Sequence, residues 1–398
     1  MADNSKRALI FGASGIIGWG ITNVLLSGYP EKGVFSDVTI AVNRPVSESD
    51  LFLPETPGGP KLQIATGVDL RNTSPKTIAA QLKDKLTGIE KITHVFYFVF
   101  TAIMDDQVKE CQLNTSMMER VAGAMNIAAP KLKSFVYAGG TRGYGIYIPN
   151  GTFEPPLVES MADNLPGDYK KTVAYPHYRR ILTEASKGHS WTWTEICPDA
   201  VVGFTPNGSG FSLALHWGQY LSLYARNHRG QDSVEVPFPG IEAAYNAKFT
   251  PVSTRILGEI AVYAALNQSN CGGKILNAAD REAPTTWSEL WPKIVADFGM
   301  VGIGPVDQDT LIGDDKLKPG EYVSKYRHLF EDAGLPKGMT CGVGDGHQQL
   351  DHVGTWLTFD RQLSLGRLRS VGFDHSLNPV NGWLDAFKKF REAGIIFK

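Results

Sequence analysis

The sequence predicts an α/β fold in which a doubly wound parallel sheet carries a smaller, mainly helical C-terminal lobe. Up to about residue 203, short apolar runs of strand length alternate with helical patterns, which is typical of such a sheet. Beyond that point the pattern changes to separate helices, such as 212–227 and 252–266, broken by loops rich in Pro and Gly. We therefore expect one domain at 1–203 and a substrate lobe mainly at 204–398, with some later segments returning to the first domain.

Six strands are expected in the first domain, each a short apolar run that leads into a turn or a helix. The expected strands cover residues 8–11, 38–42, 62–66, 94–99, 134–138 and 191–197. The helices expected between them include 16–26, about 114–128 and about 178–187. Because helices separate the strands, this order predicts a parallel sheet with helices on its faces.

The first strand runs directly into a glycine-rich turn, Gly12-Ala13-Ser14-Gly15-Ile16-Ile17-Gly18, and a helix follows at once. Glycine lets the backbone turn sharply and approach a pyrophosphate, whose charge the N-terminus of the helix then stabilises. The Gly-x-x-Gly-x-x-Gly spacing is typical of short-chain dehydrogenases/reductases, and it indicates a Rossmann-like dinucleotide site. We expect the cofactor to contact Gly12, Ser14, Gly15, Ile16 and Gly18.

The second strand ends in Asn43-Arg44-Pro45, where this kind of fold places the group that contacts the adenosine ribose. A carboxylate there would bind a free 2′-hydroxyl, whereas Asn43 and Arg44 can donate hydrogen bonds to a 2′-phosphate. The expected cofactor is therefore NADP(H), although Arg44 can also be an ordinary surface residue. After the third strand, Asp69 and Leu70 stand where such folds contact adenine, and Asp69 can equally be a turn residue or helix cap.

The composition of the 398-residue chain argues against several other classes of function. A formal net charge of -2 offers no basic surface for nucleic acid, and no apolar run is long enough to span a membrane. The N-terminus enters the first strand without an apolar signal region, so the expected compartment is the cytoplasm. The four cysteines lack paired spacing, which predicts neither a metal site nor disulfides. We expect a monomer or homodimer.

Two segments qualify for catalysis, because ligands of open α/β sheets bind at the carboxyl ends of the strands. The fifth strand runs into a turn that contains Arg142, and the stretch before the sixth strand contains Tyr175. Tyr175-x-x-x-Arg179 stands in the place of the Tyr-x-x-x-Lys helix of ordinary short-chain reductases. The alternative is that Tyr175 simply packs at the start of a helix.

Further segments match one branch of these enzymes over nearly the whole chain: 12–18, 43–45, 67–70, 141–145, 190–193, 198–204, 236–240 and 359–362. In these the chain resembles fungal-type members of the progesterone 5β-reductase/iridoid synthase-like (PRISE-like) short-chain dehydrogenases. The resemblance implies an NADPH-dependent reductase of a small apolar ketone or α,β-unsaturated carbonyl compound in fungal secondary metabolism. It implies that Tyr175 donates to the carbonyl oxygen and that the cofactor contacts Val99, Tyr175, Pro198, Ala200 and Val201. Residues 198–201 resemble the loop whose backbone binds the nicotinamide carboxamide, although they can equally form a rigid exit turn.

The sequence signals for substrate-binding residues are less specific than those for the cofactor site. Tyr144 and Tyr147 follow the fifth strand and are expected to line the substrate site. Trp217 and Tyr220 lie three residues apart on one face of a predicted helix and are expected there as well, although such a stripe is more often plain core.

Arg142 is the main departure from the family. It stands where the resemblance places the active lysine, and the family's Phe-Tyr-Tyr segment becomes Val173-Ala174-Tyr175. A nearby cation lowers the pKa of a tyrosine, so Arg142 is expected to lower that of Tyr175, but a guanidinium cannot relay a proton. Two alternatives follow: a redox-neutral cyclase or isomerase that retains NADP(H), and a non-catalytic protein that senses NADP(H).

Overall fold

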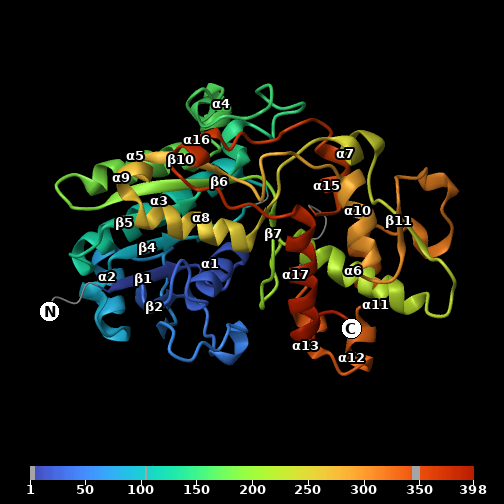
Figure 1. Cartoon of the computed structure of the whole chain (residues 1–398), viewed down its shortest axis with the longest axis horizontal. Coiled ribbons are helices and arrows are strands. Elements are labelled where there is room, and N and C mark those ends of the chain that lie inside the picture. Colours follow the sequence, from blue (N-terminus) through green and yellow to red (C-terminus); the bar gives the residue numbers. More distant parts are fainter. Residues whose placement is uncertain (1–4, 104, 343–349) are drawn as a thin grey trace. The chain divides into compact units, whose positions relative to one another are not determined.

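The computed structural model describes residues 5–103, 105–342 and 350–398. The chain divides into two compact units (Figure 1). Unit 1 comprises Met1–Asp199, Arg255–Ala278 and Ser364–His375. Unit 2 comprises Ala200–Thr254, Ala279–Leu363 and Ser376–Lys398.

Unit 1 is built on a seven-stranded parallel sheet with the strand order β10-β6-β5-β4-β1-β2-β3, which confirms the predicted fold class. The strands are β1 (Lys6–Phe11), β2 (Phe35–Ala41), β3 (Lys61–Ala65), β4 (His94–Tyr97), β5 (Ser134–Ala138), β6 (Thr192–Pro198) and β10 (Lys274–Ala278). The prediction of six strands was wrong by one. The seventh strand, β10, comes from the part of the chain beyond residue 203, of which some segments were expected to return to the first domain, and it pairs with β6, with Leu276 opposite Ile196.

Helices cover both faces of this sheet (Figure 1). The helices α2 (Pro75–Lys85), α3 (Gln107–Ala128) and α5 (Tyr175–Ser186) share one hydrophobic core with residues of β1, β4 and β5. On the other face, α1 (Ile16–Leu26) lies beside α8 (Thr254–Leu266), where a Cβ on Gly258 would meet the Val24 side chain at 2.8 Å. The shorter helices of unit 1 are α4 (Gly167–Lys170), α9 (Gln268–Cys271) and α16 (Gly366–Ser370).

Two helices begin earlier than predicted. Helix α3 starts at Gln107 rather than near 114, because Asp106 caps it by accepting a hydrogen bond from the backbone N–H of Lys109 at 2.8 Å. Helix α5 starts at Tyr175 rather than at 178, with Pro176 in its first turn, where proline is well tolerated. Tyr175 therefore stands at the first position of α5.

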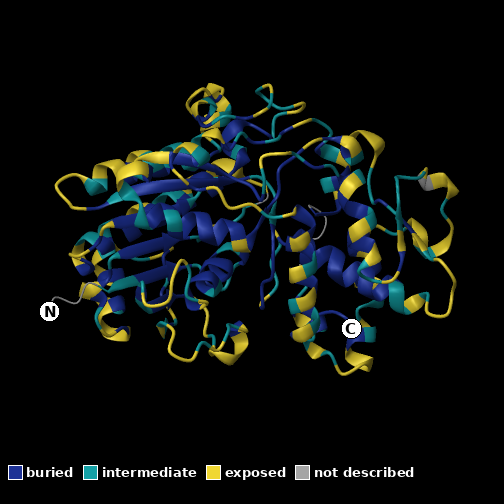
Figure 2. Ribbon diagram, viewed as in Figure 1, coloured by how far each residue is buried: buried dark blue, intermediate teal, exposed yellow. Residues whose placement is uncertain are grey.

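Unit 2 is mainly helical. Its helices are α6 (Leu213–Asn227), α7 (Glu242–Asn246), α10 (Trp287–Ala296), α11 (Pro319–Tyr326), α12 (His328–Asp332), α13 (Pro336–Thr340), α15 (Val353–Trp356) and α17 (Pro379–Glu392). Two small sheets pair β7 (Val201–Val202) with β9 (Val252–Ser253) and β8 (Glu235–Pro237) with β11 (Val301–Ile303). Figure 2 shows α6 as a largely buried helix. Among the described helices, none combines the length and apolar character needed to cross a membrane.

Candidate active site

Gly12 and Gly18 are glycines because the fold itself requires them. Gly12 has a φ of +87°, which side chains rarely adopt, and a Cβ there would lie 2.5 Å from the carbonyl oxygen of Phe98. A Cβ on Gly18 would lie 2.2 Å from the carbonyl oxygen of Gly12. These two glycines therefore allow the backbones of the turn, α1 and the end of β4 to approach one another.

Gly15 is not required in this way. Its φ is -91°, and an added Cβ would approach only the Gly12 carbonyl oxygen, at an ordinary 3.4 Å. It is the N-cap of α1 and has no side chain with which to cap the helix, and the first turn of α1 holds no acidic residue. A helix N-terminus of this kind, with unpaired backbone N–H groups in its first turn, is an arrangement that can bind pyrophosphate. Ser14 lies half-buried in the turn, and Ile16 is buried.

Gly15→Ala is expected to preserve the fold and to weaken binding of a nicotinamide dinucleotide about tenfold or more, because the new methyl group would occupy the space of a phosphate that accepts charge-assisted hydrogen bonds. Fluorescence titration with NADPH measures this loss. Gly18→Ala is the contrasting variant, and we expect it to lower the melting temperature because of its backbone clash. Unchanged NADP(H) affinity in Gly15→Ala would contradict the assignment of the turn.

The turns expected at the adenosine end of the cofactor lie against each other. The backbone N–H of Gly67 donates to Asn43 O at 3.2 Å, which joins the turn after β3 to the turn after β2. Asn43 and Arg44 are exposed, and the Arg44 side chain has no hydrogen-bond or ionic partner among the described residues. Asp69 Oδ1 accepts from the backbone N–H of Arg71 at 2.9 Å, so Asp69 does act as a turn residue.

Leu70 and Val99 complete this edge of the sheet. The Leu70 side chain is buried, and its carbonyl oxygen accepts from Arg120 Nη1 at 3.1 Å. Val99 follows β4 and is half-buried against the core, and its backbone nitrogen would lie 3.2 Å from a Cβ on Gly12. Val99 therefore lies directly beside the glycine-rich turn.

Tyr175 lies against the glycine-rich turn that follows β5. A Cβ on Gly140 would lie 3.2 Å from the Tyr175 hydroxyl oxygen, and one on Gly143 would lie 3.2 Å from its ring. The two glycines thus leave the room that the phenol occupies. Among the described residues, the Tyr175 hydroxyl has no hydrogen-bond partner, so its O–H is available to a ligand. Tyr175 stands at the carboxyl edge of the sheet, where Pro198 ends β6.

Arg142, in the same turn, is held on several sides. Its Nη1 pairs with Glu110 Oε1, and its Nη2 donates to the carbonyl oxygen of Thr172 at 2.8 Å. Its guanidinium also lies 5.2 Å from the ring centroid of Tyr147, a cation–π contact. Burial works against its charge, but the hydrogen bond and charge of Glu110 raise the pKa of Arg142. Its Nε is buried and has no hydrogen-bond partner within the described part of the chain.

Burial decides the protonation state of Tyr175. Burial raises the pKa of Tyr175 well above that of an ordinary tyrosine, and the charge of Arg142 lowers it only in part. The expected lowering by Arg142 is present, but it is outweighed. Tyr175 is therefore a neutral hydrogen-bond donor throughout the physiological pH range.

Arg179 does not point to the place of a catalytic lysine. It forms a 2.8 Å ion pair with Glu195, which is 2% exposed on β6, and the hydroxyl of Tyr137 donates to the same carboxylate oxygen at 2.7 Å. A Cβ on Gly139 would lie 2.1 Å from Glu195 Oε1. This buried cluster therefore packs against Gly139, directly after the end of β5.

The ends of β5 and β6 are also joined to each other. The Thr141 hydroxyl donates to Asp199 Oδ1 at 2.8 Å. Pro198 belongs to unit 1, whereas Ala200 and Val201 belong to unit 2, where the Ala200 carbonyl oxygen accepts from the backbone N–H of Val252 at 2.8 Å.

The residues expected on the substrate side divide into two groups. Tyr147 is half-buried beside Arg142. Tyr144 is 1% exposed, and its hydroxyl donates to Asn277 on β10 at 2.6 Å, so its side chain belongs to the core of unit 1. Trp217 stacks on Trp383 with a centroid distance of 5.3 Å inside unit 2, and it is 1% exposed.

Tyr220 is also buried, where it packs edge-on against other tyrosines of unit 2. Tyr144, Trp217 and Tyr220 thus pack in the core in this structure, and their substrate roles stay predictions. For Trp217 and Tyr220 the helical spacing is the same for a core stripe and a pocket wall.

Glu110 and Asn114 were missed by the sequence analysis. Both lie on α3 and are buried, and Asn114 binds both the N–H and the carbonyl oxygen of Thr101 at 2.8 Å. The sequence predicts that these two residues lie four apart on one helix only if the helix is known to be capped by Asp106.

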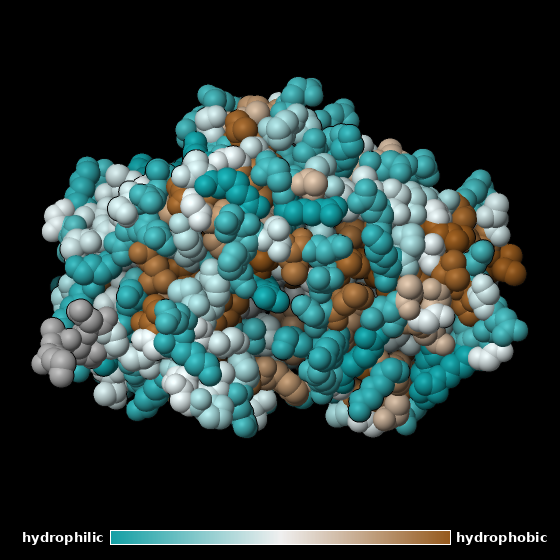
Figure 3. Space-filling view, viewed as in Figure 1, coloured by the Kyte–Doolittle hydropathy of each residue, from teal (hydrophilic) through white to brown (hydrophobic). Residues whose placement is uncertain are grey.

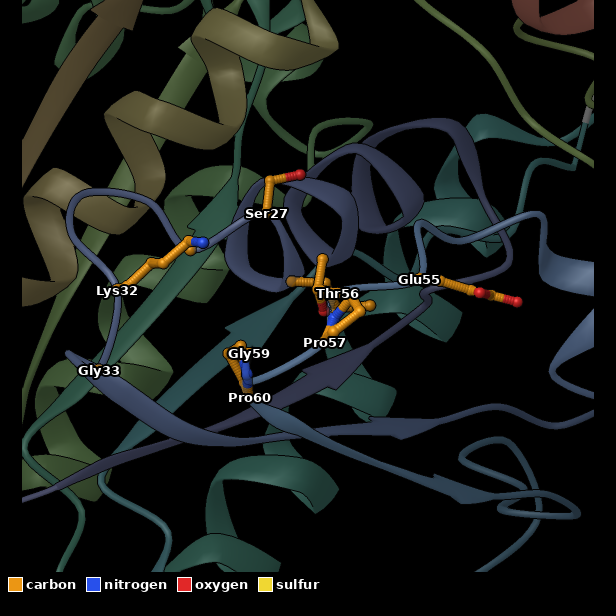
Figure 4. Close-up of a pocket in the computed structure, with 10 residues that line it drawn as sticks. Ser27, Lys32, Gly33, Glu55, Thr56, Pro57, Gly59 and Pro60 are labelled. Carbon is orange, nitrogen blue, oxygen red and sulfur yellow. The ribbon is translucent and has the colours of Figure 1, made fainter.

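A cavity of about 310 Å³ lies away from these residues (Figure 4). It is lined by the end of α1 and by the segments that precede β2 and β3, including Ser27, Lys32, Glu55 and Pro60. Residues before parallel strands lie at the amino edge of the sheet, opposite the edge that holds Tyr175. Among the described residues, no cluster of His, Cys, Asp and Glu has the make-up of a metal site.

Comparisons with known proteins agree with the motifs. The PRISE-like Rossmann-fold domain matches residues 8–397. The short chain dehydrogenase sirQ of Leptosphaeria maculans is 32% identical over 98% of this chain and 97% of its own length. The 3-oxo-Delta(4,5)-steroid 5-beta-reductase of Arabidopsis thaliana is 24% identical over 79% and 78%, respectively. The (S)-8-oxocitronellyl enol synthase CYC1 of Camptotheca acuminata is 26% identical over 72% and 74%.

Among solved structures, the GDP-mannoheptose C4 reductase of Campylobacter jejuni superposes with a TM-score of 0.59 at 13% identity, covering 98% of this chain and 100% of that one. Vestitone reductase from alfalfa gives a TM-score of 0.53 at 15% identity, covering 98% and 99%. At these identities the likeness shows the fold alone. The match of the domain family over nearly the whole chain, together with the identity to the fungal dehydrogenase, shows that this chain belongs to the PRISE-like family of Rossmann-fold short-chain dehydrogenases.

Proposed function

We propose that the protein is an NADPH-dependent reductase of a small apolar ketone or α,β-unsaturated carbonyl compound. The observation that carries this proposal is the Tyr175 hydroxyl, which stands at the carboxyl edge of the sheet with no partner among the described residues. A neutral phenol in that position can donate a hydrogen bond to a carbonyl oxygen as negative charge develops on it. Membership of a family that includes a steroid 5-beta-reductase supports the same reaction class.

The residues at the edge of the sheet fit a dinucleotide. The open N–H groups of α1 and the space beside Gly15 suit a pyrophosphate. Asn43 and Arg44 would bind the adenosine ribose with its 2′-phosphate, and Asp69 with its uncommitted carboxylate oxygen would bind adenine. When bound, the cofactor would supply the hydride.

The remaining chemistry belongs to the chain itself. Tyr175 would hold the carbonyl oxygen and supply the proton from its hydroxyl. The buried Nε–H of Arg142 has no acceptor among the residues that the structure describes, and it would bind the nicotinamide ribose or the substrate oxygen. Phe100, which directly follows Val99 after β4, is 37% exposed, so apolar surface is available in the segment that leaves the sheet beside the site. Such surface favours an apolar substrate.

The direct test is a purified-protein assay in which NADPH oxidation is followed against a panel of apolar ketones and enones. NADPH deuterated at the transferred position should deliver its label to the product. The proposal fails if no carbonyl compound in the panel causes NADPH oxidation while the natural conversion still proceeds with the Tyr175→Phe variant.

A redox-neutral cyclase or isomerase is the second candidate. It is favoured by Arg142 in the place of the family's lysine. In that case product would form while the amount of NADPH stays constant, and the product would carry no deuterium from the labelled cofactor.

The preference for NADPH depends on Arg44. Arg44→Ala is expected to weaken NADPH binding about 10- to 100-fold, because a charge-assisted hydrogen bond to the 2′-phosphate is lost, and to leave NADH binding unchanged. Titration of both cofactors measures the ratio. Arg180→Ala, which removes an exposed arginine from α5, is the matched control. Equal affinity of the unmodified protein for NADPH and NADH would refute the assignment.

A further inference from the structure

Glu110 is a buried carboxylate with both oxygens engaged. It lies in the first turn of α3, and its side chain is 7% exposed. Oε1 pairs with Nη1 of Arg142, and Oε2 accepts from the backbone N–H of Ile103 at 2.8 Å. A carboxylate removed from water is costly unless such partners replace its hydration. Glu110 is therefore held at one position between two segments of the site.

The first of these segments is the stretch 98–103, which follows β4. It leaves the sheet at Val99, beside the glycine-rich turn 12–18, and Glu110 accepts a hydrogen bond from the backbone N–H of Ile103 in it. One helical turn later, Asn114 binds the same loop through both backbone groups of Thr101. Two neighbouring buried side chains of α3 thus fix the loop that carries the exposed Phe100.

The second segment leads to Tyr175. Arg142, which Glu110 holds, donates to the Thr172 carbonyl oxygen, and its own carbonyl oxygen accepts from the Tyr169 hydroxyl at 3.1 Å. These contacts fix the turn that ends three residues before Tyr175. Among the described residues, Glu110 is the acidic side chain that pairs with Arg142.

The charges of this pair are balanced. Arg142 brings a cation close to Tyr175, and Glu110 pairs with this cation as a compensating anion. A lone buried arginine would attract any available anion into the site, whereas a paired one presents directed N–H donors with little net charge.

We propose that Glu110 is a positioning residue of this site, which acts through Arg142 to hold Tyr175 and the loop after β4 in one arrangement for a neutral carbonyl substrate. The link to turnover rests on the proposed reductase function, whereas the positioning of Tyr175 can be measured without it. In this proposal Glu110 acts through Arg142 and the loop rather than by contact with the substrate or the cofactor.

Glu110→Gln is the sharpest test, because glutamine keeps the size of the side chain but has one acceptor oxygen in place of two. It cannot satisfy both Arg142 and the Ile103 amide. We expect hydrogen exchange at the Ile103 amide to become about tenfold faster, because one charge-assisted hydrogen bond is lost. We also expect the ¹³Cζ NMR signal of Tyr175, assigned with Tyr175→Phe, to shift. Glu119→Gln, an exposed glutamate on the same helix, should change neither signal.

Turnover separates positioning from general destabilisation. Glu110→Gln is expected to lower kcat about tenfold and to leave the KM for NADPH within about twofold of the unmodified protein. If Glu110 acts through Arg142, the double variant Glu110→Gln, Arg142→Met should have the kcat of Arg142→Met alone. Multiplying effects in the double variant would overturn the proposal, as would an unmoved Tyr175 signal in Glu110→Gln.

Glu110→Asp serves if the glutamine variant does not fold, because it keeps the charge that compensates Arg142. Aspartate is one methylene shorter and cannot reach both partners, so the same NMR shift and faster exchange at Ile103 are expected, and their absence overturns the proposal. A protein that reduces no carbonyl compound but shows these signals would refute the proposed function and leave the positioning role supported.

Discussion

Tyr175→Phe is expected to lower the turnover of NADPH-dependent reduction by about 10²- to 10⁴-fold, the usual contribution of a positioned acid. Only the hydroxyl is removed, and that hydroxyl has no partner among the described residues, so the free energy of unfolding should change little. Binding of NADPH should stay within about threefold, since a single neutral hydrogen bond has a small net worth. Steady-state kinetics, fluorescence titration and thermal unfolding measure the three quantities.

Tyr178→Phe is the matched control for this variant. Tyr178 lies one turn further along α5 and packs against Tyr175 with a centroid distance of 6.3 Å, but it is buried in the core. Loss of the Tyr178 hydroxyl in this variant should leave kcat nearly unchanged. A Tyr175→Phe enzyme with the turnover of the unmodified protein would remove Tyr175 from the chemistry and leave it as a packing residue.

The pH dependence of the unmodified enzyme follows from the burial of Tyr175. Because its pKa is raised well above the ordinary value, the hydroxyl keeps its proton from neutral pH to well beyond it. We therefore expect no alkaline rise in kcat from ionised tyrosine. The hydrogen-bond donor is lost only when pH rises through the raised pKa, beyond the range in which most proteins stay folded.

The sequence could predict the elements that depend on local pattern. The strand at 134–138 and the helix at 16–26 have the predicted bounds, because an apolar run and a glycine-rich turn define each one locally. Strand β10 could not be found in this way. It has five residues, and its pairing with β6 joins positions about 80 residues apart. Such pairing depends on the sheet as a whole rather than on the segment itself.

The same distinction holds for the site. Tyr175 and Arg142 could be named because each stands in a motif, whereas the partner of Arg142 lies 32 residues away on another helix. In the sequence, Glu110 is one more charged residue near the start of a helix, and charged residues are mostly exposed. Only the tertiary structure shows that it is buried and that its oxygens are shared between a side chain and a backbone amide.

Arg142→Met is expected to destabilise the protein by about 3 to 5 kcal/mol, because it leaves the carboxylate of Glu110 buried without its ion-pair partner. Removal of both charges in Glu110→Gln, Arg142→Met should restore much of that stability. Chemical denaturation of the four proteins in this cycle gives the coupling directly. The pKa of Arg142 is raised, so its charge is present at every pH below its ordinary value, and the destabilisation should be the same at neutral and mildly alkaline pH.

Turnover of Arg142→Met should fall about 10- to 100-fold through the loss of a charge-assisted donor. Alkaline solution should not rescue it, because removal of the cation that lowers the pKa of Tyr175 moves this hydroxyl still further from ionisation. Arg142→Lys keeps the charge and one donor, so it should retain more activity than the methionine variant, although an ammonium cannot bind Glu110 and Thr172 with the fixed geometry of a guanidinium. A pH–rate profile of both variants, with NADPH titrations as the control for cofactor binding, decides the question. Alkaline recovery of Arg142→Met would show that tyrosinate takes part in the reaction, and unmodified rates at every pH would remove Arg142 from the mechanism.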